Sequence, residues 1–583
     1  MQNFPDSQHN NTVCWRRGAG AILAGSLLLA ACGGAVSDTD GVSSPSVDLS
    51  SVSSDGSSEA TAVVSAESGT ETTATSGSET ADTIADANQE DHDDISDSEW
   101  SADDETNISL DGSTVTITSP GTYHISGVLD DGQVFVDSPE NGIVRLVLDG
   151  VDITNTNGAA IEIAEADEVV VVLAEGSENR LADTARSTPD DEVNAALYSM
   201  ADLTITGIGS LTVVGSYDDA ITSKDGLVIG SGALFITAVD DAIRGKDYVV
   251  IEDGTIEMIS GGDGIKSDNE EDVERGYIAI GGGTITVDAG ADAVDAATDL
   301  LVTGGSLFLS ASGKGLKGDV VVVIDGGDLT IDTTDDAVHS NTEIVINGGE
   351  IQIATDDDAV HADSVLVVNG GVIDIAASYE GLEADLIDIN GGLMTIVSSD
   401  DAVNSPGGPG ITIDGGTIVV DAEGDGVDVN GPVTMTDGVL IINGPTASNN
   451  GALDVDGGWD MQGGFIVAVG SSNMAGAPDV DSVQGSLLST FSTQTAGTVI
   501  NIESADGTNI VTFTPSKAYE SIVVSDPDLS ADASYEVSVG GTTTSADEYG
   551  LSQAGDYEGG SVVDETTTAE AVSQNRGRGR RGP

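Results

Sequence analysis

Paired aspartates recur through the middle of the chain at a nearly fixed interval. They precede a small residue and an aliphatic residue, as in Asp335-Asp336-Ala337-Val338, and most copies follow one another after 22 residues. Carboxylates are hard oxygen ligands of the kind that Ca²⁺ binds in proteins. The residues that we predict as calcium ligands are Asp218, Asp219, Asp240, Asp241, Asp263, Asp335, Asp336, Asp357, Asp358, Asp400 and Asp401.

Stacked carboxylates need a counter-charge. Two like charges at the ~4.8 Å spacing of neighbouring strands repel by about 1 kcal/mol in water, and by more in less polar surroundings. A calcium ion with Ca–O distances of about 2.4 Å can bridge two such carboxylates. The alternative is that aspartate serves here only as a good turn residue in a salt-adapted protein.

Polar residues follow each aliphatic residue, and we expect them to face outward. Arg244 and Lys266 occupy this place in adjacent copies, with Lys246 nearby. In so acidic a chain they are either ion-pair partners of the aspartates or contacts for a sugar carboxylate, and we predict them as substrate-binding residues. His339 and His361 occupy the same place, but two histidines without cysteine are a weak zinc signal, so we expect a solvated pair.

The residue before each aliphatic residue is always Ala or Gly. This indicates a tight corner or, alternatively, a flat strip on which a polymer could lie. The aliphatic residue itself, called the anchor below, recurs at Ile221, Ile243, Ile265, Val294, Leu316, Val338, Val360, Leu382, Val403, Val427 and Leu453. One step is 29 residues long and contains an insertion around Asp268 to Arg275.

The elements that must position these residues are short strands. Residues 343–347 and 350–354 alternate between apolar and polar, and Gly348-Gly349 separates them. Three strands and three turns in about 22 residues predict one coil of a β-solenoid. The fold class is therefore all-β, a right-handed parallel β-helix with β caps, flanked by disordered acidic segments.

The chain divides into six predicted segments. Residues 105–215 form an N-terminal β cap with the first irregular coils, 216–470 the regular coils, and 471–543 a C-terminal β cap that protects the open end. Residues 33–104 are a disordered acidic tether rich in Ser and Thr, because they lack apolar residues to bury. Residues 544–583 are a disordered tail that ends in a basic stretch.

The amino terminus has the features of an export signal. Arg16 and Arg17 precede an apolar stretch that ends in Leu29-Ala30-Ala31-Cys32, which looks like a lipobox. Residues 1–32 are thus a predicted lipoprotein signal peptide with Cys32 as the lipidated residue. We expect an extracytoplasmic protein, anchored in the membrane by this lipid and displayed on the cell surface. Cys14 would leave with the signal, so no disulfide is expected.

Composition limits the partners. The 583 residues include 101 Asp and Glu against 17 Lys and Arg, a net charge of -84. Nucleic acid is excluded as a partner, because phosphate binding requires Lys and Arg. Aromatic residues are only 3%, so no broad stacking face for sugars is evident. We expect a monomer.

Several motifs in order resemble a known family. They are Gly121 to Gly127, Val144 to Gly150, Asn194 to Ala196, Asp202 to Gly207, Asp240 to Asp247 and Gly262 to Lys266. They are similar to the bacterial carbohydrate-binding domain family of calcium-containing parallel β-helices, whose fold resembles pectate lyases. The resemblance implies calcium within the helix, binding of acidic polysaccharide such as polygalacturonate, also of cellulose, and no established catalysis. Its motifs include Asp240, Asp241, Arg244, Lys246, Asp263 and Lys266, whereas the later copies depart from the acidic pairs.

Three functions remain open. The first is a non-catalytic, calcium-dependent surface lipoprotein that binds acidic polysaccharide. The second is a polysaccharide lyase that would use Arg244 or Lys266 as the base beside calcium. The third is a structural or adhesive stalk in which the acidic residues serve stability and solubility alone.

Overall fold

The computed structural model describes residues 100–101, 105–112, 114–186, 193–530, 533–552 and 556–567. These residues form strands and turns, with no helix among them, so none of them provides a helix that could cross a membrane. The predicted signal segment with Cys32, nearly all of the predicted tether and the basic carboxyl-terminal end lie outside the described residues.

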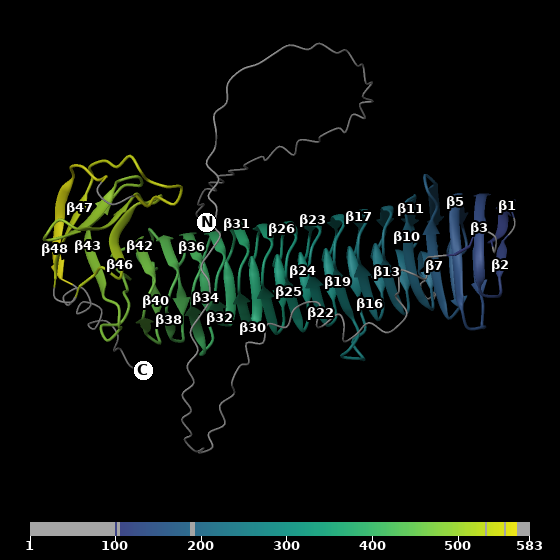
Figure 1. The fold of residues 1–583 in the computed structure, drawn as a ribbon, viewed down its shortest axis with the longest axis horizontal. Coiled ribbons are helices and arrows are strands. Elements are labelled where there is room, and N and C mark those ends of the chain that lie inside the picture. Colours follow the sequence, from purple (N-terminus) through teal and green to yellow (C-terminus); the bar gives the residue numbers. More distant parts are fainter. Residues whose placement is uncertain are drawn as a thin grey trace, which may run out of the picture. The chain divides into compact units, whose positions relative to one another are not determined.

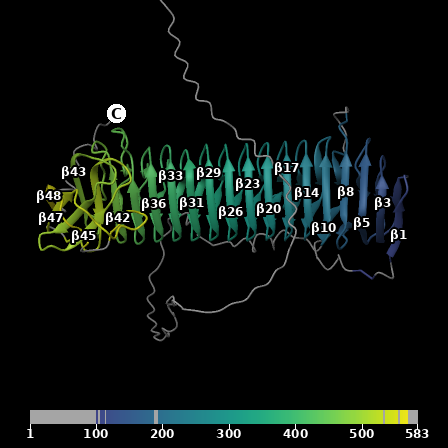
Figure 2. The ribbon, with the colours of Figure 1, turned by 90° about the horizontal axis from the view of Figure 1, so that it is seen from above.

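The described chain winds into a parallel β-solenoid, as the repeat predicts (Figure 1). Each regular coil has three short strands, and each strand pairs in parallel with its counterpart one coil later, so that three columns of strands form. Figure 2, the view from above, shows the same stack of strands.

The first column carries the anchor residues. Its strands are β2 (Val115–Ile117), β4 (Val134–Asp137), β6 (Ile161–Glu165), β9 (Ala195–Ser199), β12 (Asp219–Ser223), β15 (Ile243–Gly245), β18 (Ile265–Ser267), β21 (Val294–Ala296), β24 (Leu316–Gly318), β27 (Val338–Ser340), β34 (Val403–Ser405), β37 (Asp428–Val429) and β40 (Asp454–Val455). β30 (Val360–Val368) and β32 (Leu382–Ile389) run from this column into the second.

The second column follows the next turn. Its strands are β1 (Glu105–Leu110), β3 (Gly121–Leu129), β5 (Ile143–Asn155), β7 (Glu168–Leu173), β10 (Asp202–Gly207), β13 (Gly226–Ile229), β16 (Tyr248–Ile251), β19 (Tyr277–Ile280), β22 (Asp299–Val302), β25 (Val321–Ile324), β28 (Glu343–Ile346), β35 (Gly410–Ile413), β38 (Val433–Met435) and β41 (Trp459–Met461).

The third column closes each coil, and the last parts of β3 and β5 belong to it. Its other strands are β8 (Glu178–Asp183), β11 (Ser210–Gly215), β14 (Ala233–Ala238), β17 (Thr255–Ser260), β20 (Thr284–Ala289), β23 (Ser306–Ala311), β26 (Asp328–Thr333), β29 (Glu350–Thr355), β31 (Val372–Ser378), β33 (Leu393–Ser398), β36 (Thr417–Ala422), β39 (Val439–Asn443) and β42 (Phe465–Gly470).

Alternation of side chains builds the core. In β17, Ile256 and Met258 are buried while Glu257 and Ile259 are exposed. The anchors Ile243, Ile265 and Val294 pair in register and are fully buried. Because identical positions stack, a narrow interior filled by Val, Ile and Leu needs few aromatic residues.

Two features stabilise the turn between the second and the third strand column. Gly349 has φ 99°, a left-handed conformation that L side chains rarely adopt, after β28 ends. Beside this turn the side-chain amides of Asn347, Asn369 and Asn390 form a ladder in which each Nδ2 donates to the residue one coil earlier, over 2.6–2.8 Å.

The coil begins earlier than the sequence indicates. Within residues 105–215, predicted as an N-terminal β cap with the first irregular coils, β1 already pairs in parallel with β3, β3 with β5, and β5 with β7. The aliphatic positions are irregular there because the connecting turns vary in length, while the strand pairing is continuous into β10 and β13.

The carboxyl-terminal end is covered by antiparallel strands. β42 pairs antiparallel with β46 (Tyr519–Ser525), which also pairs with β43 (Ser486–Gln494). A separate four-stranded sheet contains β45 (Asn509–Phe513), β44 (Ile500–Ser504), β47 (Ser534–Val539) and β48 (Ser561–Thr567). The prediction that disorder begins at residue 544 is therefore wrong for β48. Its polar sequence is ordered by pairing with β47, a contact that local composition does not reveal.

Candidate functional site

Two columns of side chains flank the anchors of the first strand column. The residue two before the anchor and the residue one after it are three apart, and their side chains meet. We call these the aspartate column and the facing column, and together the acidic corner. The Oγ1 atom of Thr222 donates to Asp219 Oδ2 at 2.9 Å, Lys266 Nζ contacts Asp263 Oδ2, and His361 Nδ1 lies 3.8 Å from Asp358 Oδ2.

The aspartate column contains Asp219, Asp241, Asp263, Asp292, Lys314, Asp336, Asp358, Glu380, Asp401 and Asp425. The facing column contains Thr222, Arg244, Lys266, Asp295, Lys317, His339, His361, Glu383, Asn404, Asp428 and Asp454.

The aspartates link successive coils through a hydrogen-bond ladder. The Oδ1 atom of one aspartate accepts the backbone N–H of the residue at the same place in the next coil, over 2.5–3.2 Å. The donors Asp241, Asp263, Asp292, Lys314, Glu380, Asp425 and Gly451 bond in turn to Asp219, Asp241, Asp263, Asp292, Asp358, Asp401 and Asp425. One oxygen of each of these seven acceptors is thus structural, and in Asp219 and Asp263 the other oxygen contacts the facing column.

Burial makes several of these acids weak. It raises the pKa of Asp219 to about 6 and the pKa of Asp241 to about 7. Burial also raises the pKa of Asp425 to about 7, and neighbouring carboxylates add to the effect. A cation placed among these carboxylates would relieve both the burial cost and the repulsion.

Six of the predicted calcium ligands come together in space as two groups of three. Carboxylate oxygens of Asp218, Asp219 and Asp240 lie within 4.8 Å of one another, and so do those of Asp335, Asp336 and Asp357. Asp241 and Asp263 lie on the same column, and Asp401 accepts the N–H of Asp425. Asp358 groups instead with His361 and Glu383.

The side-chain amide of Asn194 contacts the first cluster. Asn194 donates through Nδ2 to Asp219 Oδ2 at 2.6 Å and to Asp218 Oδ2 at 3.3 Å. Its Oδ1 atom is buried and accepts no hydrogen bond. The amide thus faces the cluster through Nδ2, and the three carboxylates are an all-oxygen donor set, which suits Ca²⁺.

Sequence reasoning missed a third acidic group, formed by Asp263, Asp292 and Asp295. The signal was present, because Asp292 and Asp295 are three residues apart around the anchor Val294. Lys266 and Lys317 compensate it: Lys317 Nζ lies 2.7 Å from Asp295 Oδ1, and Lys266 Nζ lies 3.7 Å from Asp295 Oδ2.

The predicted substrate-binding cations contact the protein's own carboxylates. Arg244 pairs with Asp268 and lies 3.7 Å from Asp219 Oδ2, and Lys266 pairs with Asp263. Although burial opposes it, these contacts raise the pKa of Arg244 and of Lys266. Lys246 is half-buried in the turn after β15. The ion-pair alternative for Arg244 and Lys266 is therefore what the structure shows.

Two expectations about the corner are wrong. The facing column does not always face solvent, because Thr222 is fully buried and His339 is 8% exposed. In the pair that was expected to be solvated, His339 is accordingly buried, whereas the side chain of His361 is 25% exposed. The Ala and Gly column is no exposed strip either, since Ala220, Ala242 and Ala293 are fully buried. A Cβ on Gly264 would meet the carbonyl oxygen of Ala293 at 2.5 Å, so this is a tight corner.

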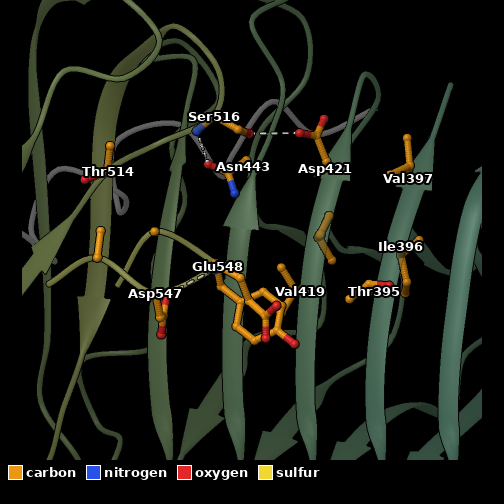
Figure 3. Close-up of a pocket in the computed structure, with 14 residues that line it drawn as sticks. Thr395, Ile396, Val397, Val419, Asp421, Asn443, Thr514, Ser516, Asp547 and Glu548 are labelled. Carbon is orange, nitrogen blue, oxygen red and sulfur yellow. Dashed lines mark hydrogen bonds between the residues drawn. The ribbon is translucent and has the colours of Figure 1, made fainter. Parts of the chain in front are cut away.

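A cavity of about 400 Å³ lies outside this corner, where the carboxyl-terminal cap meets the late coils (Figure 3). Strands β33, β36 and β39 supply Thr395, Val419 and Asn443, and residues 546–550 close it from the cap. Its wall includes Tyr549 together with Asp421, Asp547 and Glu548. The combination of one aromatic ring with carboxylates suits an uncharged, hydroxyl-rich ligand better than an anionic one.

Part of the solenoid is similar to known proteins. Residues 111–359 match the model of a family described as "Carbohydrate-binding domain-containing protein". Over these residues the chain is similar to that family. The matched residues include the Asp218, Asp219 and Asp240 cluster, whereas His361 and Glu383 come after them.

Two relatives are similar to parts of this chain. A protein of Acetivibrio thermocellus with the same description is 39% identical over 142 residues, which are 24% of this chain and 50% of that protein. The chain thus spans about half the length of that relative. A solved structure, "Structure of the polysaccharide lyase-like protein from C. thermocellum, Gadolinium derivative", is 35% identical and covers 37% of this chain and 95% of that one, with a TM-score of 0.36.

Proposed function

We propose that this chain is a non-catalytic carbohydrate-binding protein that binds acidic polysaccharide, polygalacturonate or a similar polymer, through calcium held at the acidic corner. The family match supports the ligand class. The observation that carries the calcium assignment is the cluster of Asp218, Asp219 and Asp240, whose carboxylate oxygens lie within 4.8 Å of one another. Calcium with part of its coordination shell open supplies a cation for the carboxylates of the polymer.

The same corner explains why bare protein would bind such a polymer poorly. The charges of Arg244 and Lys266 are already balanced by Asp268 and Asp263. The remaining side chains of the cluster are acids that repel an anionic chain. Binding should therefore depend on calcium rather than on these cations.

A glycan pull-down with polygalacturonate and with cellulose, in calcium and in chelator, tests the proposal. The variant Asp218→Asn/Asp240→Asn removes two carboxylates from half-buried and exposed positions, so the fold should survive. The matched control Asp288→Asn/Asp332→Asn removes two exposed carboxylates from β20 and β26. We expect calcium-dependent retention of polygalacturonate that the first variant loses and the control keeps.

Other results would point elsewhere. Retention that is equal in calcium and in chelator, with a lower melting temperature in chelator, would assign the ions to structure alone. Retention of neither polymer under any condition would favour the stalk. Retention of cellulose that Tyr549→Ala abolishes would place a neutral glycan at the cavity in Figure 3 instead.

One observation keeps a lyase as the second candidate. A general base needs a lowered pKa, and the contacts of Arg244 and Lys266 raise theirs. Lys224 differs, because burial and the charge of Arg244 lower its pKa. The charges of Asp219 and Asp218 act in the opposite direction, but the net shift of the pKa is downward. Release of ultraviolet-absorbing unsaturated product from polygalacturonate in calcium, lost in Lys224→Met, would establish this activity. The absence of product at high protein concentration would leave binding alone.

We further propose that the protein is attached to the membrane by a lipid on Cys32 and displayed outside the cytoplasm. The lipobox-like Leu29-Ala30-Ala31-Cys32 supports this. Labelled fatty acid should be incorporated into the native chain and not into Cys32→Ser, which should appear in the soluble fraction. Incorporation into both would refute the assignment.

A further inference from the structure

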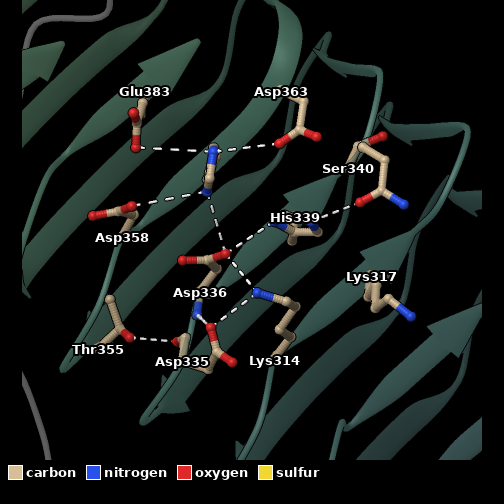
Figure 4. Close-up of polar contacts among 12 residues, drawn as sticks. Lys314, Lys317, Asp335, Asp336, His339, Ser340, Thr355, Asp358, Asp363 and Glu383 are labelled. Carbon is tan, nitrogen blue, oxygen red and sulfur yellow. Dashed lines mark hydrogen bonds and ion pairs between the residues drawn. The ribbon is translucent and has the colours of Figure 1, made fainter. Parts of the chain in front are cut away.

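Two imidazoles converge on one carboxylate in the middle of the solenoid. His339 Nδ1 lies 2.9 Å from Asp336 Oδ2, and His361 Nδ1, one coil later, lies 3.4 Å from the same oxygen. The two rings are edge to face with centroids 5.1 Å apart. Figure 4 shows Asp336 between His339 and Lys314, with Asp358 and Glu383 on the far side.

The tautomer of His339 is fixed by its neighbours. Its Nε2 lies 3.1 Å from Asn341 Oδ1, and Asn341 Nδ2 donates to Asp319 Oδ1 at 3.1 Å, so that the amide oxygen faces the imidazole. Nε2 is then the protonated nitrogen and Nδ1 carries the lone pair. This Nδ1 is buried and makes no hydrogen bond, despite its closeness to Asp336.

A buried lone pair against a carboxylate oxygen is unfavourable unless a proton or a metal ion lies between them, and a metal ion can take the place of the proton. The outer hydrogen bond from Nε2 to an oxygen is the arrangement that typically orients a metal-binding histidine. In a tetrahedral site with bonds of about 2.0–2.1 Å, neighbouring ligand atoms are about 3.4 Å apart. The 3.4 Å between His361 Nδ1 and Asp336 Oδ2 matches such an edge, whereas the 2.9 Å between His339 Nδ1 and the same oxygen is shorter, so a bound ion would move these two atoms apart.

We propose that Asp336, His339 and His361 bind one divalent transition-metal ion of the zinc class. Two nitrogen donors beside one oxygen disfavour calcium, which binds oxygen ligands, and favour zinc or its neighbours. This position thus takes a different ion from the oxygen-only cluster at Asp218, although both belong to the same corner. Glu383 and Asp358, which group with His361, are the nearest candidates for a fourth ligand.

Lys314 competes with this ion. Its Nζ lies 2.6 Å from Asp336 Oδ2 and 2.9 Å from Asp335 Oδ1. When the metal binds, the ammonium can remain with Asp335, which is more exposed. A bound ion would join His339 of one coil to His361 of the next, and so fasten two neighbouring coils at the middle of the stack.

The test is a zinc titration of the chelator-stripped full chain against a chromophoric competitor, with cobalt as a spectroscopic substitute. We expect the visible absorption of cobalt in tetrahedral nitrogen and oxygen coordination. His339→Gln and His361→Gln should each lower zinc affinity at least tenfold, since even outer partners of a metal ligand contribute about 10–100-fold. Lys314→Met should raise the affinity, because the competing charge is gone.

His124→Gln is the matched control. His124 also lies between two carboxylates, 3.1 Å from Glu105 and 3.0 Å from Asp149, but without a second imidazole. Zinc affinity should not change in this variant. Should His339→Gln unfold the coil, His361→Gln, whose side chain is 25% exposed, still decides the matter. Unchanged zinc affinity in a folded His361→Gln, or an octahedral cobalt spectrum, would overturn the proposal.

Discussion

The Oδ1 atom of Asp241 accepts the backbone N–H of Asp263, its counterpart one coil later, at 2.8 Å. Asp263 is in turn the acceptor for Asp292, so a carboxylate that resembles a ligand also supports the next turn of the chain. This double use means that removing the charge and removing the acceptor should have different effects.

Asp241→Ala should therefore lower the free energy of unfolding by about 1–3 kcal/mol, because the buried N–H of Asp263 loses its partner. Asp241→Asn keeps an acceptor oxygen and should cost clearly less. Chemical denaturation of both variants in chelator measures the difference. Equal losses would show that charge, and not the ladder, is what the position provides.

The stability should depend on pH with an unusual sign. Burial raises the folded-state pKa of Asp425 to about 7, above the usual value of 3.8 in an unfolded chain. The folded state then binds the proton more tightly, so this contribution is fully present below pH 4 and is lost as the pH rises through 7. Each unit of difference in pKa between the two states corresponds to about 1.4 kcal/mol.

Melting in chelator between pH 4 and 8 should show this loss, and Asp425→Asn should reduce it. Asp421→Asn, an exchange outside the corner, is the control for the removal of one charge. A melting temperature that rises throughout this range in the native chain would contradict the prediction.

Lys266 should act as a built-in substitute for a metal ion. Its ammonium lies against Asp263 and within 3.9 Å of Asp241. Lys266→Met should lower the melting temperature in chelator and raise the affinity for calcium, because three acidic neighbours lose their cation. Lys517→Met, which breaks pairs with Asp421 and Glu423 instead, should leave calcium affinity unchanged. Isothermal titration with calcium distinguishes these outcomes.

The tight corner can be tested with a single methyl group. In Gly264→Ala the new Cβ would meet Val287 Cγ1 at 2.4 Å and the carbonyl of Ala293 at 2.5 Å, which requires a shift of the coil. We expect a loss of about 1–3 kcal/mol. Gly408→Ala has no atom within 4 Å of its Cβ and should change stability by less than about 0.5 kcal/mol. Thermal melting compares the two.

Much of the fold follows from the repeat in the sequence. The spacing of anchors such as Ile243 and Ile265 fixes which residues stack, because parallel pairing in register copies each position into the next coil. The clusters around Asp218 and Asp335 follow from that register. The length of the solenoid does not follow from the repeat, since the irregular segment before residue 216 pairs as continuously as the later coils.

The partners within the corner could not be predicted in the same way. That Thr222 lies inside and reaches Asp219 depends on how sharply the chain bends at the anchor, which composition does not encode. The ladder depends on the offset between a side chain in one coil and an amide in the next. Lys314, which interrupts the run of acids in the aspartate column, forms ion pairs with Asp335 and Asp336 of the next coil.

The ladder also gives the stack a direction. Every link has its acceptor in the earlier coil and its donor in the later one, as from Asp219 to Asp241 and from Asp401 to Asp425. A completed coil therefore presents ready acceptors to the segment that follows it in the chain, and none of these bonds requires a segment still to come. In the coils that the ladder joins, each later turn is thus held by a carboxylate of the turn before it, while backbone bonds of the same corner, such as that from the N–H of Ala242 to the carbonyl oxygen of Asp263, run the other way.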